Sequence, residues 1–356
     1  MQLRSVSRRL ATALVCLTPL AVAALPAHSA RASSVATRPH ASLRIGLVLD
    51  VGGRDDKSFN QLAYQGAVTA KQRYGADFNY VQSSAISNPI YYANLARFAR
   101  QKYDLVIGVG FLMGQAMLQA GKAFPNTHFA LIDSSPLDAK GNTVNLSNVA
   151  NIFFKEQESG YLVGYMAGLM EKGKVGAATH NTIGTMGGVS IPPVNRYIAG
   201  YIQGARAADP SIKIKLGYSQ DFNDTSKALN IGQGQIAQGA DILFAVAGNA
   251  GTGYLKAAQE KGRYGIGVDA DQSFLGSYMM SSALKRVDQA VLLTVGAVMH
   301  GTFKGGDNIY SLKNGATGYG VVGKFVPSSI VAQVRAKQAL IAAGKITPTT
   351  TIPTNL

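Results

Sequence analysis

From residue 43 onward, segments with the pattern of a strand alternate with segments with the pattern of a helix. This alternation constrains the fold more than any single motif. The expected strands are nearly continuous apolar runs, and several expected helices end at a glycine, as at Gly75, Gly173, Gly239 and Gly262. Apolar strands joined by helices are typical of parallel sheets covered on both faces. The sequence therefore predicts an α/β protein.

The expected elements can be given as residue ranges. Strands are expected at 43–50, 78–82, 105–110, 128–134, 183–186, 212–219, 241–248 and 265–269. Helices are expected at 58–74, 89–102, 114–123, 157–172, 193–208, 225–238 and 253–261. Residues 103–110 resemble residues 240–248, and a repeat at this long spacing predicts two similarly built lobes rather than a solenoid.

The chain is expected to pass between the two lobes three times, near 149–154, 277–283 and 318–323. The lobe bounds that follow are 43–154 plus 284–320 for lobe 1, and 155–283 plus 321–356 for lobe 2. A ligand cleft is expected between them.

The first 30 residues have the composition of a signal peptide. Three arginines fall within the first nine residues, residues 10–25 are almost wholly apolar, and small residues around 27–32 offer cleavage sites. Cys16, the only cysteine, lacks the small preceding residue of a lipobox, so we expect it to be lost with the leader. Residues 31–42 are polar and are expected to form a flexible linker. The mature protein is predicted to be periplasmic, without a lipid anchor.

Charge and composition exclude several classes of function. Five arginines among the first 42 residues account for part of the +15 formal net charge, and the other basic residues are scattered. Without tryptophan or a basic–aromatic stripe, nucleic-acid binding is not expected. No Walker sequence, nucleophile elbow or zinc-type histidine pair is present, and residues 108–114 miss a dinucleotide fingerprint by one residue. The sequence predicts no catalytic residue, metal or cofactor.

Three aspartates lie at the carboxyl ends of predicted strands, where ligands bind in open α/β sheets. They are Asp50, Asp133 and Asp269. A carboxylate can accept hydrogen bonds from two adjacent hydroxyls, as a ribose diol offers. A single aspartate at such a position is often only a cap of a turn or helix. Three of them facing one cleft favour a ligand site.

The segment 43–66 joins a predicted strand, a Gly-Gly turn and the start of a helix. Ser58 is the expected N-cap of this helix, and Phe59 offers an aromatic face to a planar ligand. Asn60 belongs to the same polar end of the lobe. The residues between Asp55 and Lys57 are expected to form a solvated, salt-bridged turn.

Three residues elsewhere are further candidates for the ligand site. Phe222 and Tyr254 are alternatives for the ring opposite Phe59, although either residue suits ordinary packing. Asn249 offers an amide to a ligand, but its Gly-Asn-Ala-Gly context also fits a tight turn that needs these residue types.

Six parts of the sequence together resemble the basic membrane protein (BMP) family of ABC-transporter substrate-binding proteins, whose best-known members are purine nucleoside receptors. They are DVGGRDDKSFNQ (50–61), ESGYLVGYMAG (158–168), Gly187-Gly188 with Pro193-Val194 and residues 197–204, AGNAGTG (247–253), GVDADQ (267–272) and SALKRVD (282–288). The resemblance covers residues 43–345 and implies a type I periplasmic-binding-protein fold. In that fold, two doubly wound lobes are joined by hinge strands and enclose the ligand cleft.

The resemblance also implies roles for individual residues. These are contact with the purine edge for Asp50 and Asn60, stacking for Phe59, a polar contact for Asp133, and ribose recognition for Asp269 beside Lys285. The implied protein is a non-enzymatic, monomeric receptor that closes on a purine nucleoside and delivers it to an ABC permease in the inner membrane.

Two alternatives stay open at this point. One is a receptor of the same fold for a sugar or another small polar solute, because an aromatic face with an aspartate also fits a pyranose. The other is a secreted nucleoside hydrolase, which would need a metal held by Asp50, Asp55 and Asp56.

Overall fold

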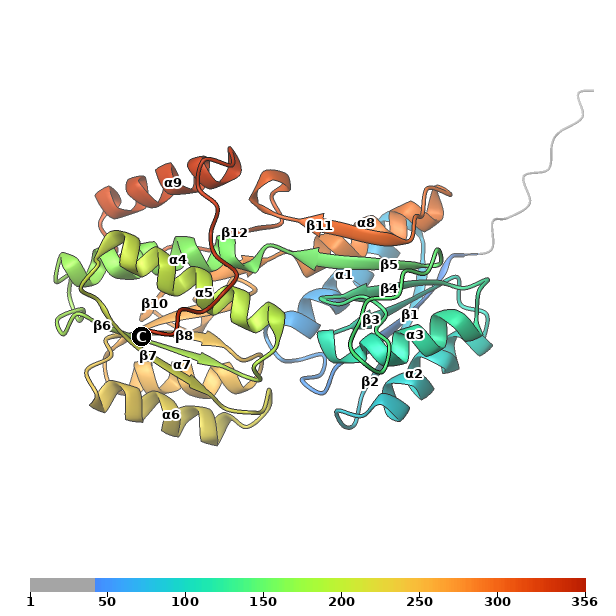
Figure 1. Ribbon diagram of the computed structural model, residues 1–356, viewed down its shortest axis with the longest axis horizontal. Coiled ribbons are helices and arrows are strands. Elements are labelled where there is room, and N and C mark those ends of the chain that lie inside the picture. The colour runs from blue at the N-terminus through green and yellow to red at the C-terminus, as the bar shows by residue number, and fades with distance from the viewer. Residues whose placement is uncertain (1–41) are drawn as a thin grey trace, which may run out of the picture. The chain divides into compact units, whose positions relative to one another are not determined.

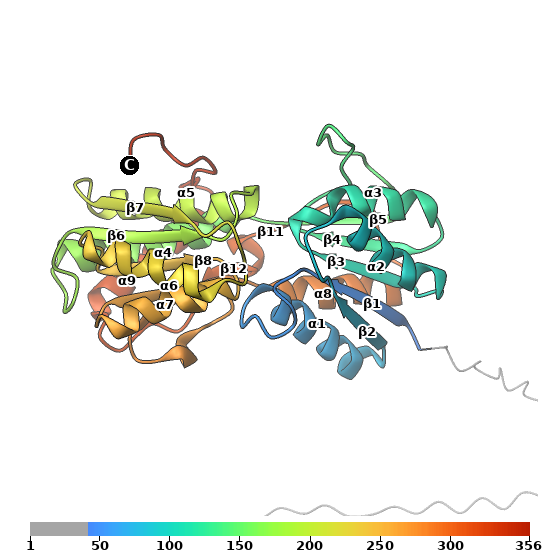
Figure 2. The ribbon, with the colours of Figure 1, turned by 90° about the horizontal axis from the view of Figure 1, so that it is seen from below.

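The computed structural model describes residues 42–356, which form one compact unit. The predicted signal peptide, Cys16 and all but the last residue of the predicted linker lie outside the described residues. Within 42–356 the elements gather in two lobes, each built on one six-stranded sheet (Figure 1, Figure 2). The predicted α/β fold with two doubly wound lobes is confirmed.

The sheet of lobe 1 has the order β11-β5-β4-β3-β1-β2, and all neighbouring strands are parallel. Its strands are β1 (Arg44–Leu49), β2 (Asp77–Gln82), β3 (Leu105–Val109), β4 (His128–Ile132), β5 (Val149–Phe154) and β11 (Gly306–Tyr310). Helices α1 (Phe59–Tyr74) and α8 (Val287–Met299) pack on one face, and α2 (Asn88–Arg100) and α3 (Gly114–Ala123) on the other.

The sheet of lobe 2 has the order β12-β10-β9-β8-β6-β7, and only β12 is antiparallel to its neighbour. Its strands are β6 (Thr182–Gly187), β7 (Lys213–Tyr218), β8 (Ile242–Val246), β9 (Tyr264–Asp269), β10 (Met279–Lys285) and β12 (Thr317–Tyr319). Helices α4 (Glu156–Lys172), α5 (Pro192–Ala208) and α9 (Ser328–Ala342) cover one face, and α6 (Thr225–Ala237) and α7 (Ala250–Glu260) cover the other.

The sequence repeat falls on β3 and β8, which hold the same place in the two strand orders. The two sheets therefore share one strand order and differ in direction only at the edge strands, β11 parallel and β12 antiparallel to its neighbour. Short 3₁₀ turns η1 (Phe111–Met113), η2 (Ser273–Leu275) and η3 (Leu312–Asn314) complete the described elements. Helices α8 and α9 were not among the expected ones. No helix within residues 42–356 is long and apolar enough to cross a bilayer.

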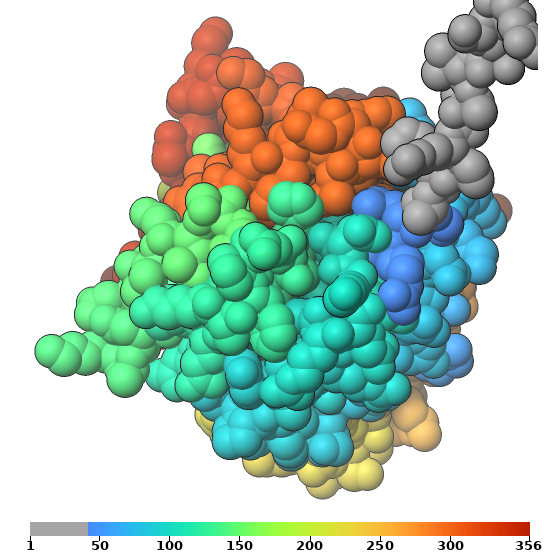
Figure 3. Space-filling model, turned by 90° about the vertical axis from the view of Figure 1, so that its right-hand side faces the viewer, coloured from blue at the N-terminus to red at the C-terminus, as the bar shows by residue number. Residues whose placement is uncertain are grey.

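The chain passes between the lobes after β5, after β10 and between β11 and β12. The last passage lies earlier than the sequence predicts, because residues 317–319 already pair with β10 in the sheet of lobe 2. As a result, α8 and β11 belong to lobe 1 although they follow most of lobe 2. Figure 3 shows this on the surface of lobe 1, where residues near 300 (orange) lie against residues from the first part of the chain (blue to green).

Glycines bring α4 and α5 unusually close together. A side chain at Gly160, Gly164, Gly200 or Gly204 would collide with the backbone of the other helix. This close approach fixes the position of Tyr197 on α5 relative to Glu156 at the start of α4. Part of the motif that the sequence places at 158–168 therefore has a packing explanation, and the packing leads directly to the site.

Candidate functional site

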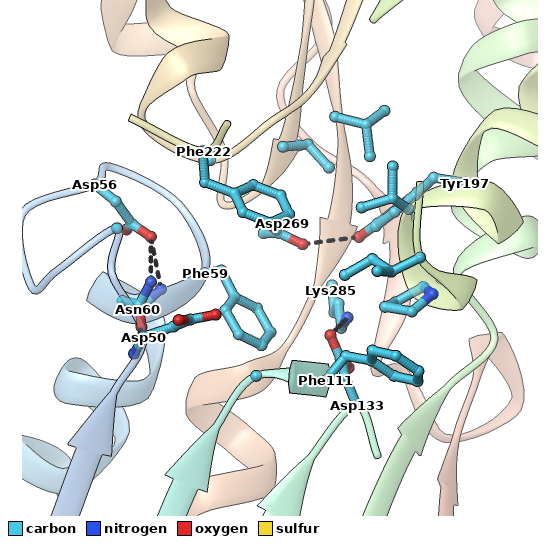
Figure 4. A pocket seen from close by; sticks show the side chains of 18 residues that line it. Asp50, Asp56, Phe59, Asn60, Phe111, Asp133, Tyr197, Phe222, Asp269 and Lys285 are labelled. Carbon is cyan, nitrogen blue, oxygen red and sulfur yellow. Dashed lines mark hydrogen bonds and ion pairs between the residues drawn. The ribbon is translucent and has the colours of Figure 1, made fainter. Parts of the chain in front are cut away.

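A cavity with about 620 Å³ of space free of protein atoms lies between the carboxyl ends of the two sheets (Figure 4). Lobe 1 contributes Asp50, Asp56, Phe59, Asn60, Phe111 and Asp133 to its wall. Lobe 2 contributes Tyr197, Phe222, Asp269 and Lys285, together with apolar and glycine residues. Seven of the nine predicted site residues therefore line one cavity. The two that do not are Ser58 and Asn249.

Asp50 directly follows β1, and its two carboxylate oxygens have different neighbours. Its Oδ1 accepts hydrogen bonds from the Tyr91 hydroxyl at 2.6 Å and from the Val51 amide at 2.7 Å. Its Oδ2 faces Gly110, where a side chain would approach it to 2.8 Å. Burial raises the pKa of Asp50, while the hydrogen bonds from Tyr91 and Val51 oppose that rise.

Asn60 supports Asp50 from the first turn of α1. Its Oδ1 accepts a hydrogen bond from the Asp50 amide at 3.0 Å, and its Nδ2 donates to Asp56 at 2.9 Å. These two bonds use one lone pair of Oδ1 and one N–H of Nδ2, so the side chain keeps one acceptor and one donor position. The contact with a purine edge that the resemblance implies stays a prediction.

The start of α1 is capped by Asp56 and not by Ser58. Asp56 accepts hydrogen bonds from the backbone amides of Ser58, Asn60 and Gln61. It is 1% exposed, so the prediction of a wholly solvated turn is wrong at this residue. Asp55 does form the expected exposed ion pair with Arg54, at 2.9 Å. Ser58 occupies the N-cap position, but its side chain makes no capping hydrogen bond.

Ser58 instead joins the lobes. Its hydroxyl donates to Asp269 Oδ2 at 2.7 Å, while the Tyr197 hydroxyl donates to Asp269 Oδ1 at 3.1 Å. Burial raises the pKa of Asp269, and the nearby charge of Lys285 and the hydrogen bond from Ser58 oppose this rise. Two further contacts between the lobes accompany this one, from Gln272 to the Lys57 carbonyl and from Asn223 to the Val51 carbonyl.

Asp133 is held from across the cleft by Lys285. The Lys285 ammonium donates to Asp133 Oδ2 at 2.6 Å and to Glu156 Oε1 at 3.0 Å, and Arg196 donates to the other oxygen of Glu156 at 2.6 Å. Burial alone would lower the pKa of Lys285, but the carboxylates of Asp133 and Glu156 raise it. Lys285 therefore stays charged.

The Asp133 carboxylate combines this ion pair with an unused acceptor. Burial raises its pKa to about 6, although the charge of Lys285 opposes the rise. Its Oδ1 is buried and has no hydrogen-bond partner among the described residues. Because an unpaired buried acceptor is costly, this oxygen is a natural partner for a ligand donor.

Asp133 and Asp269 also share a backbone feature. Their φ angles are +72° and +61°, in the left-handed region that residues other than glycine rarely adopt. Each residue comes at the carboxyl end of its strand, β4 in lobe 1 and β9 in lobe 2. Strained positions of this kind cluster at ligand sites, because the surrounding structure has to hold them.

Aromatic rings from both lobes border the cavity. Phe59 and Phe111 come from lobe 1 and Phe222 from lobe 2, and all three point into the same space (Figure 4). Gly188 lets Phe222 lie against the backbone, since a side chain there would collide with the ring. The alternative that Tyr254 supplies the ring opposite Phe59 is wrong, because Tyr254 is fully buried in lobe 2 and its hydroxyl donates to Gln235.

Asn249 lies outside the cavity, at the N-cap position of α7. Its backbone is right-handed helical, so the positive φ of this turn belongs to Gly248 instead, at +53°. The turn supports the beginning of α7, and the structure gives the Asn249 side chain no place beside the other candidates.

Sequence reasoning missed several residues of the site. Phe111 follows β3 in the near-fingerprint at 108–114, and its position after a strand was the available signal. Tyr197 begins one of the family-like stretches, 197–204, but no role at the site was predicted for it, and Glu156 and Arg196 have no local pattern that marks them. Their roles depend on how α4 packs against α5, which no short sequence window reveals. Within residues 42–356, no three His, Cys, Asp or Glu side chains are grouped to hold a metal ion.

Comparison with known proteins places this arrangement in a family. Residues 44–354 match the Bmp family, described as ABC transporter substrate-binding protein, PnrA-like. The chain belongs to this family. Its members bind a solute without converting it, so the prediction of a non-enzymatic protein is confirmed and the hydrolase alternative is excluded.

Individual relatives of this Bmp protein agree with the assignment. An ABC transporter nucleoside-binding protein of Lactococcus lactis is 30% identical over 363 residues, which cover 96% of this chain and 98% of the relative. An uncharacterized lipoprotein of Pyrococcus abyssi is 34% identical over 291 residues, covering 78% and 69%. The crystal structure of an ABC transporter solute-binding protein from Aeropyrum pernix superposes with a TM-score of 0.78 at 26% identity, covering 88% and 94%.

Proposed function

We propose that this substrate-binding protein binds a purine nucleoside between its lobes and delivers it to the permease of an ABC importer. The observation that carries the proposal is the cavity itself, in which aromatic rings from both lobes face buried carboxylates with unused acceptor capacity. A nucleoside combines a flat base with a diol, and these two parts match the rings and the carboxylates. The name of the Lactococcus lactis relative supports the same ligand class.

Each part of the ligand has a partner in this proposal. Phe59 and Phe222 hold the base between them, and Asp133 Oδ1 accepts a hydrogen bond from a donor of the ligand. Asp269 accepts from the ribose hydroxyls through the lone pairs that Ser58 and Tyr197 leave free. Ligand contacts to both lobes favour the closed arrangement, which the permease recognises.

We further propose that the protein acts as a monomer in the periplasm after its leader is removed at Ala30 or Ala32. Substrate-binding proteins of ABC importers work on the outer side of the cytoplasmic membrane. The Pyrococcus abyssi relative is named a lipoprotein. Mass spectrometry of the mature N-terminus tests the proposal, and an acylated Cys16 would contradict it.

Isothermal titration calorimetry with a panel of ligands tests the nucleoside assignment. Inosine, guanosine and adenosine are compared with hypoxanthine, ribose and galactose. We expect micromolar or tighter binding of at least one nucleoside, about −8 kcal/mol or better, and weaker binding of the free base. Tight binding of galactose with no response to nucleosides would identify a sugar receptor instead.

The role of Asp269 is tested in the same experiment. Asp269→Ala removes hydrogen bonds to a charged group, so nucleoside affinity should fall at least about tenfold. Asp77→Ala, which removes an exposed carboxylate on β2, is the matched control. Unchanged affinity in the Asp269 variant would contradict its assignment to the ribose.

A further inference from the structure

Asp50 of the cavity wall is contacted from behind by Tyr91, which does not itself line the cavity. Tyr91 lies on α2, is 1% exposed and packs in the core of lobe 1. Its hydroxyl nevertheless donates to Asp50 Oδ1 at 2.6 Å, a short hydrogen bond to a carboxylate. A buried tyrosine hydroxyl needs a hydrogen-bond partner, and here that partner is a carboxylate of the cavity wall.

The two oxygens of Asp50 are consequently unequal. Oδ1 is occupied by the Tyr91 hydroxyl and the Val51 amide. Oδ2 receives no hydrogen bond from the residues that the structure describes, and it lies beside Gly110, which like Asp50 lines the cavity. The absence of a side chain at Gly110 leaves the space in front of Oδ2 open.

We propose that Tyr91 is a positioning residue for ligand recognition: by occupying Oδ1 it fixes the Asp50 carboxylate with Oδ2 as the acceptor presented to the ligand. This rests on the proposed nucleoside function for the nature of the ligand, but the contact between Tyr91 and Asp50 does not depend on it. Without the hydroxyl, only the Val51 amide holds Oδ1, and the carboxylate is fixed less firmly.

Among the described residues, Tyr91 is the one side chain that donates to Asp50 Oδ1, beside the backbone amide of Val51. The titratable groups that act on Asp50 are Tyr91 from α2 and Asp56 from the turn before α1. Asp56 is an acceptor, already used by the amides of α1, and cannot donate to the carboxylate when ionised. Gly110, directly after β3, brings no side chain, and Asn60 contacts the backbone of Asp50.

A double-mutant cycle tests the proposal, with inosine as the probe in calorimetry at pH 7.5. Tyr91→Phe keeps the ring and removes only the hydroxyl, so affinity should fall about tenfold. In the Asp50→Ala background the same change should alter affinity less than about twofold, because its partner is gone. Tyr201→Phe is the control, since it removes another fully buried hydroxyl, in lobe 2 away from the cavity.

A second measurement works without any ligand. In ligand-free protein labelled at its aspartate carboxyl carbons, NMR titration should show a higher pKa for Asp50 in Tyr91→Phe than in the parent, because the hydrogen bond that stabilises the carboxylate is lost. Equal loss of affinity in both backgrounds, or an unchanged pKa, would overturn the proposal. If the parent binds no inosine, the nucleoside function fails while this titration still decides the role of Tyr91.

Discussion

The two lobes share one strand order, yet they present equivalent aspartates in different ways. Asp133 after β4 and Asp269 at the end of β9 both have left-handed backbones. Asp269 is already hydrogen bonded through both oxygens, whereas Asp133 has one oxygen in an ion pair and the other without a partner. The common framework fixes where a carboxylate stands, and its neighbours decide whether it is available to a ligand.

The difference extends to charge. Asp133 depends on a lysine from the other lobe, while Asp269 receives neutral hydroxyls from Ser58 and Tyr197. Each aspartate therefore draws one partner from the opposite lobe. Closing the cleft therefore brings each carboxylate its partner from the other lobe, and substitutions on either lobe separate the two contributions.

Lys285→Met should have the largest effect. Lys285 is almost fully buried and pairs with both Asp133 and Glu156, so its loss leaves two buried carboxylates facing each other. We expect the free energy of unfolding at pH 7 to fall by about 3–5 kcal/mol in urea denaturation. Lys256→Met, which removes an exposed lysine of α7, is the control. Similar losses in both variants would show that the buried pair has no special role.

Phe59→Ala and Phe222→Ala compare the aromatic contributions of the lobes. Stacking predicts that each substitution weakens nucleoside binding by about 1–3 kcal/mol, with little change in the melting temperature of the ligand-free protein. A core role would instead lower stability by about 3–5 kcal/mol. Phe59→Tyr should keep most of the binding. If Phe59→Ala is strongly destabilised but binds the nucleoside with unchanged affinity, the stacking role of Phe59 is contradicted.

The pH dependence of binding should follow Asp133. Its pKa is raised to about 6, so below that pH the carboxyl is protonated, loses its charge and becomes a weaker hydrogen-bond acceptor. Nucleoside affinity should fall by up to about tenfold between pH 6 and pH 5, or about 1.4 kcal/mol. The free energy of unfolding changes in the other direction. Because the folded state binds the Asp133 proton more tightly than the unfolded state, the protein becomes more stable as the pH falls through about 6. Asp133→Asn should remove this part of the pH dependence in calorimetry.

The smallest effect is expected at the helix starts that follow β1 and β6. α1 is capped by the side chain of Asp56, whereas α5 begins with two prolines and has no side-chain cap. Asp56→Ala should lower the free energy of unfolding by about 1 kcal/mol. Asp55→Ala, at the exposed neighbouring position, should leave the urea midpoint unchanged. Equal behaviour of the two variants would contradict the capping role of Asp56.

The two lobes could be predicted from the sequence because strands and helices have recognisable local patterns. Each of the eight expected strands is present in the structure, and Asp50, Asp133 and Asp269 meet at one cavity as their strand-end positions indicate. Glycines mark the turns, and the apolar runs are long enough to identify buried strands. These properties depend on neighbours in the chain.

The parts that escaped prediction depend on distant contacts. Ser58 looks like a helix cap, but Asp269, more than 200 residues later, takes its hydroxyl. Asp56 looks like part of a solvated turn, yet it is buried because lobe 1 folds over it. Tyr91 and Glu156 carry no local signal at all. Contacts between distant parts of the chain, within a lobe or across the cleft, determine the roles of these side chains, and a short sequence window does not reveal them.

The passage of the chain between the lobes affects how the protein is made. Lobe 1 begins with residue 42, but α8 covers the same face of its sheet as α1, and β11 completes the edge beside β5. Until residue 310 has been synthesised, α1 alone covers that face and the edge of β5 stays unpaired. The nascent chain therefore exposes part of this apolar face and the unpaired edge of β5 while residues 155–285 are synthesised. A pair of consecutive domains would complete each sheet earlier and would be exposed to misfolding and aggregation for a shorter time.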